Sequence, residues 1–153
     1  MTNNYPWPLQ VDPDILYPID AYNQLLESLN WTNQAHWFNH WIKRGGVKLA
    51  SSAWPLGVKN DWIWGIGLPF LSDIERFILD DQRILFGISG LPGCGKTTFG
   101  RWLEAASSNL NWPVKVLSMD DFYLDSQALN KAMAGNPWNV PRALPGSHSI
   151  ELF

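Results

Sequence analysis

The sequence contains little cysteine and few charged residues, and both features limit the functions that the protein can have. Its 153 residues include one cysteine, so the chain cannot form an internal disulfide, which is typical of proteins in a reducing cytosol. Only 16% of the residues are charged, and the formal net charge is −3. Nucleic acids and anionic membranes select basic surfaces, so this charge argues against either as a partner.

The sequence also lacks a long apolar run. Its longest, Trp62–Leu71, contains glycine and proline and is too short to cross a bilayer. Residues 1–14 have neither the basic nor the apolar region of a signal peptide. Since 46% of the residues are hydrophobic, we expect a globular protein of the cytoplasm. Its ten tryptophans are many for this length and are expected to pack a helical core or an interface.

Residues 1–81 have the pattern of a helical extension. Three leucines follow the helical period in a first helix: Leu25, Leu26 and Leu29. A second helix is predicted to begin at Thr32 and end at Gly45-Gly46. Four apolar residues share one face of that helix: Trp37, Phe38, Trp41 and Ile42. Ser72–Glu75 has the form of a capping box, which predicts a third helix starting there.

Between the second and third helices, glycines and prolines interrupt every periodic pattern. Ala53–Leu71 is therefore predicted to be irregular chain that packs against the helices.

Residues 82–153 have the pattern of an α/β core. Arg83–Ser89 and Val114–Ser118 are short apolar runs, as expected of strands buried on both faces, and Lys96–Ser108 between them has a helical pattern. A strand, a helix and a strand in this order predict a parallel β-α-β unit. Further along, Ser126–Met133 is predicted to be a helix and Gly135–Ser149 a loop. The predicted fold is an incomplete P-loop NTPase-type parallel sheet flanked by helices, with a tryptophan-rich helical extension.

The stretch after the first predicted strand fits G-x-x-x-x-G-K-[ST], the phosphate-binding loop or Walker A motif. Glycines turn successive backbone N–H groups inward and let a phosphate approach them, and the following helix adds its positive N-terminal dipole. Lys96 is suited to reach the β- and γ-phosphates of ATP, and the Thr97 hydroxyl to join the Mg²⁺ shell. The predicted binding residues are Gly90, Leu91, Pro92, Gly93, Cys94, Gly95, Lys96, Thr97 and Thr98.

Two carboxylates, Asp120 and Asp121, follow the second predicted strand. In open α/β sheets ligands bind at the carboxyl ends of strands. A phosphotransferase needs a carboxylate there to deprotonate the acceptor hydroxyl or to help hold Mg²⁺. We therefore predict both residues, together with Lys96, as catalytic residues, and Asp120 with Thr97 as metal ligands. The alternative is a solvated acidic turn or a helix N-cap.

Two histidines, His36 and His40, are spaced by four residues on the predicted second helix, a spacing that can bind zinc. No cysteine or suitably spaced carboxylate is near them in the sequence. We therefore interpret the spacing as a property of the helix and predict no zinc site.

These motifs resemble a known group of enzymes. "GISGLPGCGKTT", "VLSMDDFYL" and "NPW" followed by "PRALPGSH" are similar to P-loop kinases of small metabolites, and most closely to the D-glycerate 3-kinases of plants and cyanobacteria. The resemblance implies an ATP-dependent kinase that forms 3-phosphoglycerate. It implies ATP and Mg²⁺ as cofactors, and it places the acceptor substrate near Asp120, Tyr123, Arg142 and His148. An arginine suits a carboxylate because its planar guanidinium bonds two oxygens at once.

The sequence departs from the family pattern R-G-x-P-G-[ST]-H-D at two positions, where Ala143 and Ser149 replace the glycine and the final aspartate. Members of the family are also longer, so the resemblance implies the N-terminal part of such a kinase. Two alternatives stay open. One is a P-loop kinase of another small alcohol, of the uridine or pantothenate type. The other is a non-catalytic nucleotide-binding remnant that associates with a partner, or with itself through an incomplete sheet edge.

Overall fold

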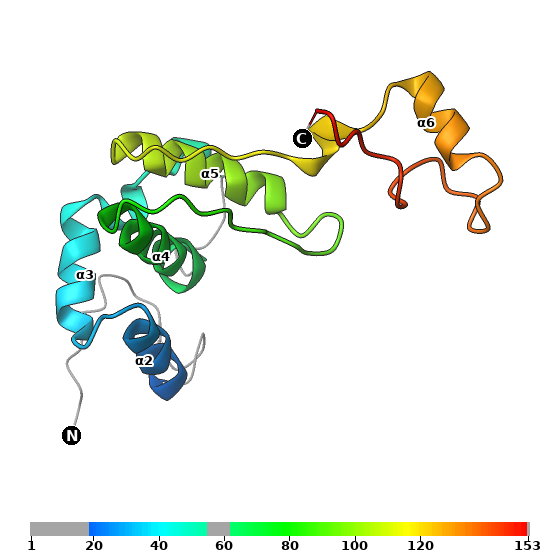
Figure 1. The fold of residues 1–153 in the computed structure, drawn as a ribbon. Coiled ribbons are helices and arrows are strands. Elements are labelled where there is room, and N and C mark those ends of the chain that lie inside the picture. The colour runs from blue at the N-terminus through cyan, green and yellow to red at the C-terminus, as the bar shows by residue number, and fades with distance from the viewer. Residues whose placement is uncertain (1–18, 55–61, 153) are drawn as a thin grey trace. The chain divides into compact units, whose positions relative to one another are not determined.

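The computed structural model describes residues 19–54 and 62–152, and its regular elements there are helices (Figure 1). The chain forms two compact units, which divide between Val114 and Lys115. The domain boundary predicted between residues 81 and 82 stays a prediction. The longer helices are α2 (Ile19–Ser28), α3 (Gln34–Lys43), α4 (Leu68–Leu79), α5 (Lys96–Asn109) and α6 (Ser126–Met133). None of the described helices is long and apolar enough to span a membrane.

Tryptophans of α3 form the centre of the first unit. Trp37 and Trp41 are completely buried and Phe38 is 1% exposed, as the helical pattern predicted. Trp37 meets Trp64 edge to face at 5.7 Å between ring centroids, and the Tyr22 hydroxyl of α2 donates to the Trp64 carbonyl at 3.1 Å. Such edge-to-face pairs are stabilised beyond their buried area, so the tryptophans hold the helical part together.

The ends of α3 are close to those predicted. Asn33 caps the helix by accepting from the His36 N–H at 3.1 Å, so α3 begins two residues after Thr32. Gly45 has φ 108° and Gly46 φ 50°, which confirms that the glycine pair ends the helix. The inward position predicted for Ile42 is wrong, because its side chain is 45% exposed.

Ser72 was predicted to begin the third helix, and this prediction is wrong. The helix α4 begins at Leu68, with Pro69 in its first turn, and Ser72 lies one turn inside. The Ser72 hydroxyl donates to the Leu68 carbonyl at 3.0 Å, and it accepts from the indole N–H groups of Trp37 at 2.8 Å and Trp41 at 2.9 Å. It thus satisfies two buried donors instead of capping a helix.

The irregular chain predicted for Ala53–Leu71 is only partly found. Residues 55–61 lie outside the described part of the chain, and Leu68–Leu71 belongs to α4. Ile63–Gly67 forms a π-helical turn, in which Gly67 lies so close to Trp102 that a Cβ there would be 2.7 Å from the indole ring. Only glycine allows this approach, which joins α5 to the helical extension.

The predicted parallel sheet is contradicted, because neither residues 83–89 nor residues 114–118 form a strand. Residues 83–89 run extended along α4, where the Phe86 ring lies 5.1 Å from that of Phe70 and 5.7 Å from that of Phe77. Leu85 is 81% exposed. A strand exists only when a neighbour accepts and donates its backbone hydrogen bonds, and no such neighbour is present among the described residues. Self-association of the chain stays a prediction. The described residues contain no sheet edge through which it could occur.

Helix α4 is also linked to α3 by a charged network at the edge of the core. The Arg44 Nη1 donates to His40 Nδ1 at 2.7 Å, and Arg44 Nη2 donates to Glu75 Oε1 at 3.1 Å. Since arginine can only donate, His40 Nδ1 is an acceptor, and the ring proton lies on Nε2, which donates to Glu75 Oε2 at 2.7 Å. The network therefore requires a neutral His40.

This network predicts acid sensitivity of the first unit. Burial of the ring is the largest cause and lowers the pKa of His40; Glu75 opposes the shift, and Arg44 adds to it. Below the unfolded-state pKa of about 6.5, the unfolded chain therefore binds a proton that the folded chain resists. The stabilisation of the fold by the neutral His40 network is present above that pH, and it is lost as the pH falls through the folded-state pKa of His40. We expect the free energy of unfolding in urea to fall between about pH 7 and pH 5.

The His40→Gln variant is expected to lose part of this pH dependence. The matched control is His36→Gln, on the exposed side of the same helix, which should keep the wild-type slope. Equal slopes for wild type and His40→Gln would contradict the neutral network.

The second unit contains the short 3₁₀ turn η4 (Met119–Phe122) and α6, whose bounds are those predicted. Asp125 caps α6 by accepting from the N–H groups of Gln127 and Ala128, both at 2.9 Å. The predicted loop after α6 folds back, so that Tyr123 and His148 form an isolated antiparallel bridge. This bridge places two of the residues predicted to bind the acceptor substrate, Tyr123 and His148, next to one another.

Candidate functional site

The predicted phosphate loop is an exposed turn that leads into α5. Gly93 has φ 77° and Gly95 has φ 91°, a left-handed region that residues with a Cβ rarely adopt. Gly95 is the N-cap of α5, so the first N–H groups of the helix have no side-chain cap. They are therefore available to an anion, which the helix dipole also attracts.

The turn is closed by Gly90 and Cys94. The Cys94 N–H donates to the Leu91 carbonyl at 3.2 Å, and a Cβ on Gly90 would lie 2.8 Å from Cys94 Sγ. The two glycine features of the motif thus have different causes, a close approach at Gly90 and a positive φ at Gly93 and Gly95. The positive φ at Gly93 and Gly95 supports the sequence prediction that this backbone needs glycine, whereas a Cβ at Gly90 would displace the exposed Cys94 thiol.

The Lys96 side chain lies across the loop. Its Nζ donates to the carbonyls of Gly90 at 2.7 Å and Leu91 at 3.0 Å. The positive charge is therefore held over the turn, where it would meet a phosphate bound by the loop. Thr97 follows on α5 and is exposed. The glycine turn, the free helix terminus and the lysine fit a nucleotide polyphosphate, with Thr97 as the hydroxyl available to a Mg²⁺ ion.

The loop is connected to the core through α5. Trp102 is completely buried, and its indole N–H donates to the Leu49 carbonyl at 3.0 Å. Its ring meets Trp54 edge to face at 5.6 Å and stacks on Phe99 at 6.0 Å. Trp102 and Leu103 form the buried side of α5. These contacts of Trp102 anchor α5 to the core and thereby orient its first N–H groups.

Asp120 and Asp121 lie in the second unit, in the turn η4, and both are exposed. Ser118 begins the turn: its hydroxyl accepts from the Asp120 N–H at 3.3 Å, and its carbonyl accepts from the Asp121 N–H at 3.0 Å. The backbone of the two aspartates is thus fixed while their carboxylates face solvent. The described residues contain no cluster of three or more metal-ligating side chains, so any metal here would take part of its shell from substrate or water.

The structure brings together Tyr123, Arg142 and His148, which the resemblance had connected to the acceptor. The Tyr123 and His148 rings stack at 4.2 Å with an interplanar angle of 24°. The Arg142 guanidinium carbon lies 5.6 Å from the centre of the Tyr123 ring, within the range of a cation–π contact. A cation and an imidazole thus flank one tyrosine, an arrangement suited to a small polar anion.

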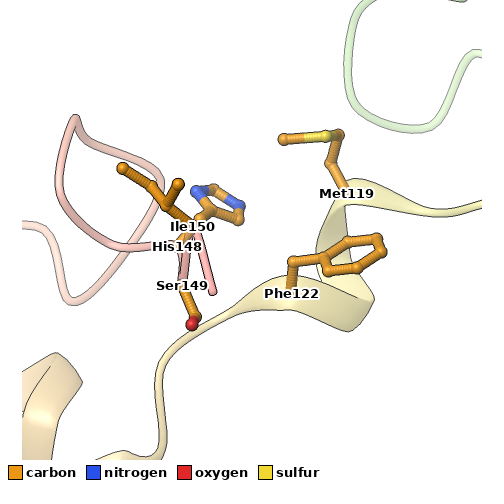
Figure 2. A pocket seen from close by; sticks show the side chains of 5 residues that line it. All are labelled: Met119, Phe122, His148, Ser149 and Ile150. Atoms are coloured by element: carbon orange, nitrogen blue, oxygen red, sulfur yellow. The ribbon is translucent and has the colours of Figure 1, made fainter. Parts of the chain in front are cut away.

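A pocket of about 180 Å³ lies beside this group (Figure 2). The His148 ring and the Met119 side chain project toward the space between their two backbone segments (Figure 2). The pocket is lined by Met119, Phe122, His148, Ser149 and Ile150. The sequence prediction missed the three apolar residues, although two of them flank the Asp-Asp pair. Ser149, where the family pattern has aspartate, is therefore among the residues that line the pocket.

The other departure from the family pattern, Ala143, has φ 71°. An alanine in this region costs about 1–2 kcal/mol, more than the conformational entropy that glycine would lose on folding. We therefore expect Ala143→Gly to stabilise the second unit by about 0.5–1 kcal/mol, measured by urea unfolding. The control is Ala134→Gly, where φ is −60° and the same change should destabilise. A destabilised Ala143→Gly variant would contradict the assignment of strain.

Comparison with known proteins finds similarity to a kinase. Over 77 residues, the chain is 32% identical to the uncharacterized kinase mug58 of Schizosaccharomyces pombe. The match covers 48% of this chain and 28% of the yeast protein, so the chain spans well under half of that relative. No family model matches the chain. No solved structure matches it either. The chain is thus similar, over about half of its length, to a kinase whose name states no substrate.

Proposed function

We propose that this chain carries the nucleotide-binding and acceptor-binding parts of an ATP-dependent kinase whose substrate is a small hydroxy acid, with glycerate as the first candidate. The observation that carries the proposal is the loop before α5, where two left-handed glycines, an uncapped helix N-terminus and the Lys96 ammonium surround one turn. The similarity to a yeast kinase supports phosphoryl transfer. The choice of glycerate rests on the resemblance of the motifs.

In this proposal the loop N–H groups and Lys96 neutralise the charge of the β- and γ-phosphates. Thr97 would hold part of the shell of a Mg²⁺ ion, which would supply further charge neutralisation. Asp120 would orient the acceptor hydroxyl and take its proton as the oxygen attacks the γ-phosphorus, while the bond from the γ-phosphorus to the bridging oxygen breaks and ADP leaves. Asp121 would assist as the second carboxylate. Arg142 binds the carboxylate of the acceptor as a planar fork.

The test is an ADP-release assay with the full chain, MgATP, and D-glycerate, uridine, pantothenate or no acceptor. We expect turnover with glycerate. Lys96→Ala should lower it about 100-fold or more, because an interaction with transferring phosphate is lost. The control is Lys48→Ala, an exposed lysine of the same unit, which should keep wild-type turnover. Turnover with uridine or pantothenate alone would disprove the acid substrate. A folded chain that is silent with every acceptor would disprove catalysis by this chain and support the nucleotide-binding remnant.

Binding of ATP is measured separately by equilibrium dialysis with labelled MgATP. Binding that is lost in Lys96→Ala and kept in Lys48→Ala is expected whether or not the chain turns over. Absence of binding to a folded wild-type chain would disprove the phosphate loop itself.

The Arg142→Lys variant separates an acid acceptor from a neutral one. Lysine keeps the charge but loses the bidentate fork, so the KM for glycerate is expected to rise about tenfold while the KM for MgATP stays unchanged. Equal KM values for glycerate in both proteins would contradict the assignment of Arg142 to the carboxylate.

A further inference from the structure

Ser147, next to His148, is completely buried, and its hydroxyl has two neighbours. Its Oγ lies 2.7 Å from the Leu144 carbonyl oxygen and 3.1 Å from His148 Nδ1. A carbonyl oxygen can only accept, so the hydroxyl must donate to Leu144. The backbone N–H of Ser147 donates to the same carbonyl at 3.1 Å, which fixes the serine in this position.

A serine hydroxyl has one hydrogen, and here that hydrogen is committed to Leu144. The contact between Ser147 Oγ and His148 Nδ1 is therefore favourable only if Nδ1 carries a hydrogen and donates it. With a bare Nδ1, two lone pairs would face each other beside a buried group that water does not reach, at a cost comparable to a lost hydrogen bond. The neutral imidazole accordingly has its proton on Nδ1 and its lone pair on Nε2.

The ring cannot easily turn away from this contact. The Leu124 N–H donates to the Ser147 carbonyl at 3.0 Å, and the Ser149 N–H donates to the Phe122 carbonyl at 2.8 Å, so both neighbours of His148 are tied to the segment around Tyr123. The Tyr123 ring covers one face of the imidazole at 4.2 Å. Backbone pairing and stacking thus fix the plane of the ring and leave Nε2 as its free end among the described residues.

We propose that Ser147 is a positioning residue that holds the proton of His148 on Nδ1, so that Nε2 accepts a hydrogen bond from a hydroxyl group of the acceptor substrate. This inference rests on the proposed function, in which His148 meets the acceptor. It divides the recognition of a hydroxy acid between two groups: a lone pair on Nε2 repels a carboxylate and accepts from a hydroxyl, while the Arg142 guanidinium binds the carboxylate. His148 is also one of the residues that line the pocket beside this group (Figure 2).

The first test is the tautomer of His148 in the full chain, measured by NMR with ¹⁵N-labelled histidine about two pH units above the ordinary histidine pKa. The spectrum of His148→Gln assigns the signal. We expect hydrogen on Nδ1 and a bare Nε2, and a mixture of tautomers in Ser147→Ala. Ser147→Thr keeps the hydroxyl and should restore the single tautomer. A proton on Nε2 in the wild type would overturn the inference, and this outcome needs no variant to fold.

The second test adds ligands to the same labelled protein. D-Glycerate should shift the Nε2 signal, whereas propionate, a carboxylate of the same length without hydroxyl groups, should not. An equal shift with both would overturn the hydroxyl contact.

The third test is the ADP-release assay, where Ser147→Ala should raise the KM for glycerate about fivefold to tenfold and leave the KM for MgATP unchanged. An unchanged glycerate KM with active enzyme would overturn the inference but leave the proposed kinase activity in place. Conversely, a silent assay together with the expected tautomer would disprove the proposed activity and, with it, the substrate role of His148, but not the positioning by Ser147.

Discussion

The Ser72→Ala variant is expected to lose about 3–5 kcal/mol of the free energy of unfolding of the first unit. The Ser72 hydroxyl is the hydrogen-bond acceptor of two buried indole N–H groups, those of Trp37 and Trp41. Alanine removes the acceptor and leaves both donors without one in a site that water does not reach, and each such donor costs about 1–3 kcal/mol. Urea unfolding followed by far-ultraviolet circular dichroism measures the loss.

The matched control is Ser107→Ala, because Ser107 is also a completely buried serine of a helix. Its hydroxyl has no hydrogen-bond partner in the described part of the chain. Removing it deletes a polar group without leaving another one unsatisfied, so this variant is expected to be as stable as the wild type or slightly more stable. If both alanine variants lose the same stability, the cost comes from the buried volume and not from the two indoles.

The Trp102→Ala variant is expected to be destabilised by about 4–5 kcal/mol, since a large aromatic side chain is removed from a fully packed site. The change leaves a cavity next to Gly67 and deprives the Leu49 carbonyl of its donor. Because Trp102 fixes α5 to the helical extension, MgATP binding should weaken together with stability. Equilibrium urea unfolding and dialysis with labelled MgATP measure the two effects.

Trp102→Phe separates the loss of the aromatic ring from the loss of the indole N–H donor. It keeps an aromatic ring in the core but loses the N–H donor, so a loss of about 1–3 kcal/mol is expected, less than that of the alanine variant. Trp138→Ala makes the same chemical change as Trp102→Ala at a side chain that is 69% exposed and should be nearly neutral. A neutral Trp102→Ala variant would contradict the anchoring of α5 by this residue.

Local patterns in the sequence predicted the helices well. Glycines end α3, and the bounds of α5 and α6 are close to those predicted from the helical pattern, because these signals depend on neighbouring residues only. The turn of the phosphate loop was predictable for the same reason. Gly93 and Gly95 adopt left-handed angles that the motif itself encodes.

The predictions that failed depend on contacts between distant residues. Arg83–Ser89 is apolar enough for a buried strand, but a strand needs a partner, and no periodic pattern states whether one is present. Ser72 matched a capping box because the local sequence does not show that Trp37 and Trp41 lie over it. The π-helical turn at Ile63–Gly67 was missed, and its last residue packs against Trp102, which lies far along the chain.

The distribution of tryptophan gives the chain two optical reporters. Trp138 is the one tryptophan of residues 115–153, and it is 69% exposed, whereas Trp37, Trp41, Trp64 and Trp102 are buried in the first unit. An aqueous quencher should therefore reach Trp138 before these buried rings, and Trp138→Phe should remove the contribution of the second unit to the quenchable emission, while Trp62 of the first unit, 47% exposed, keeps its own contribution. The protected fluorescence would then report on the first unit, and the difference between the wild type and Trp138→Phe would report on the second. Ligand-induced changes could in this way be attributed to the nucleotide loop or to the acceptor group without attaching a dye.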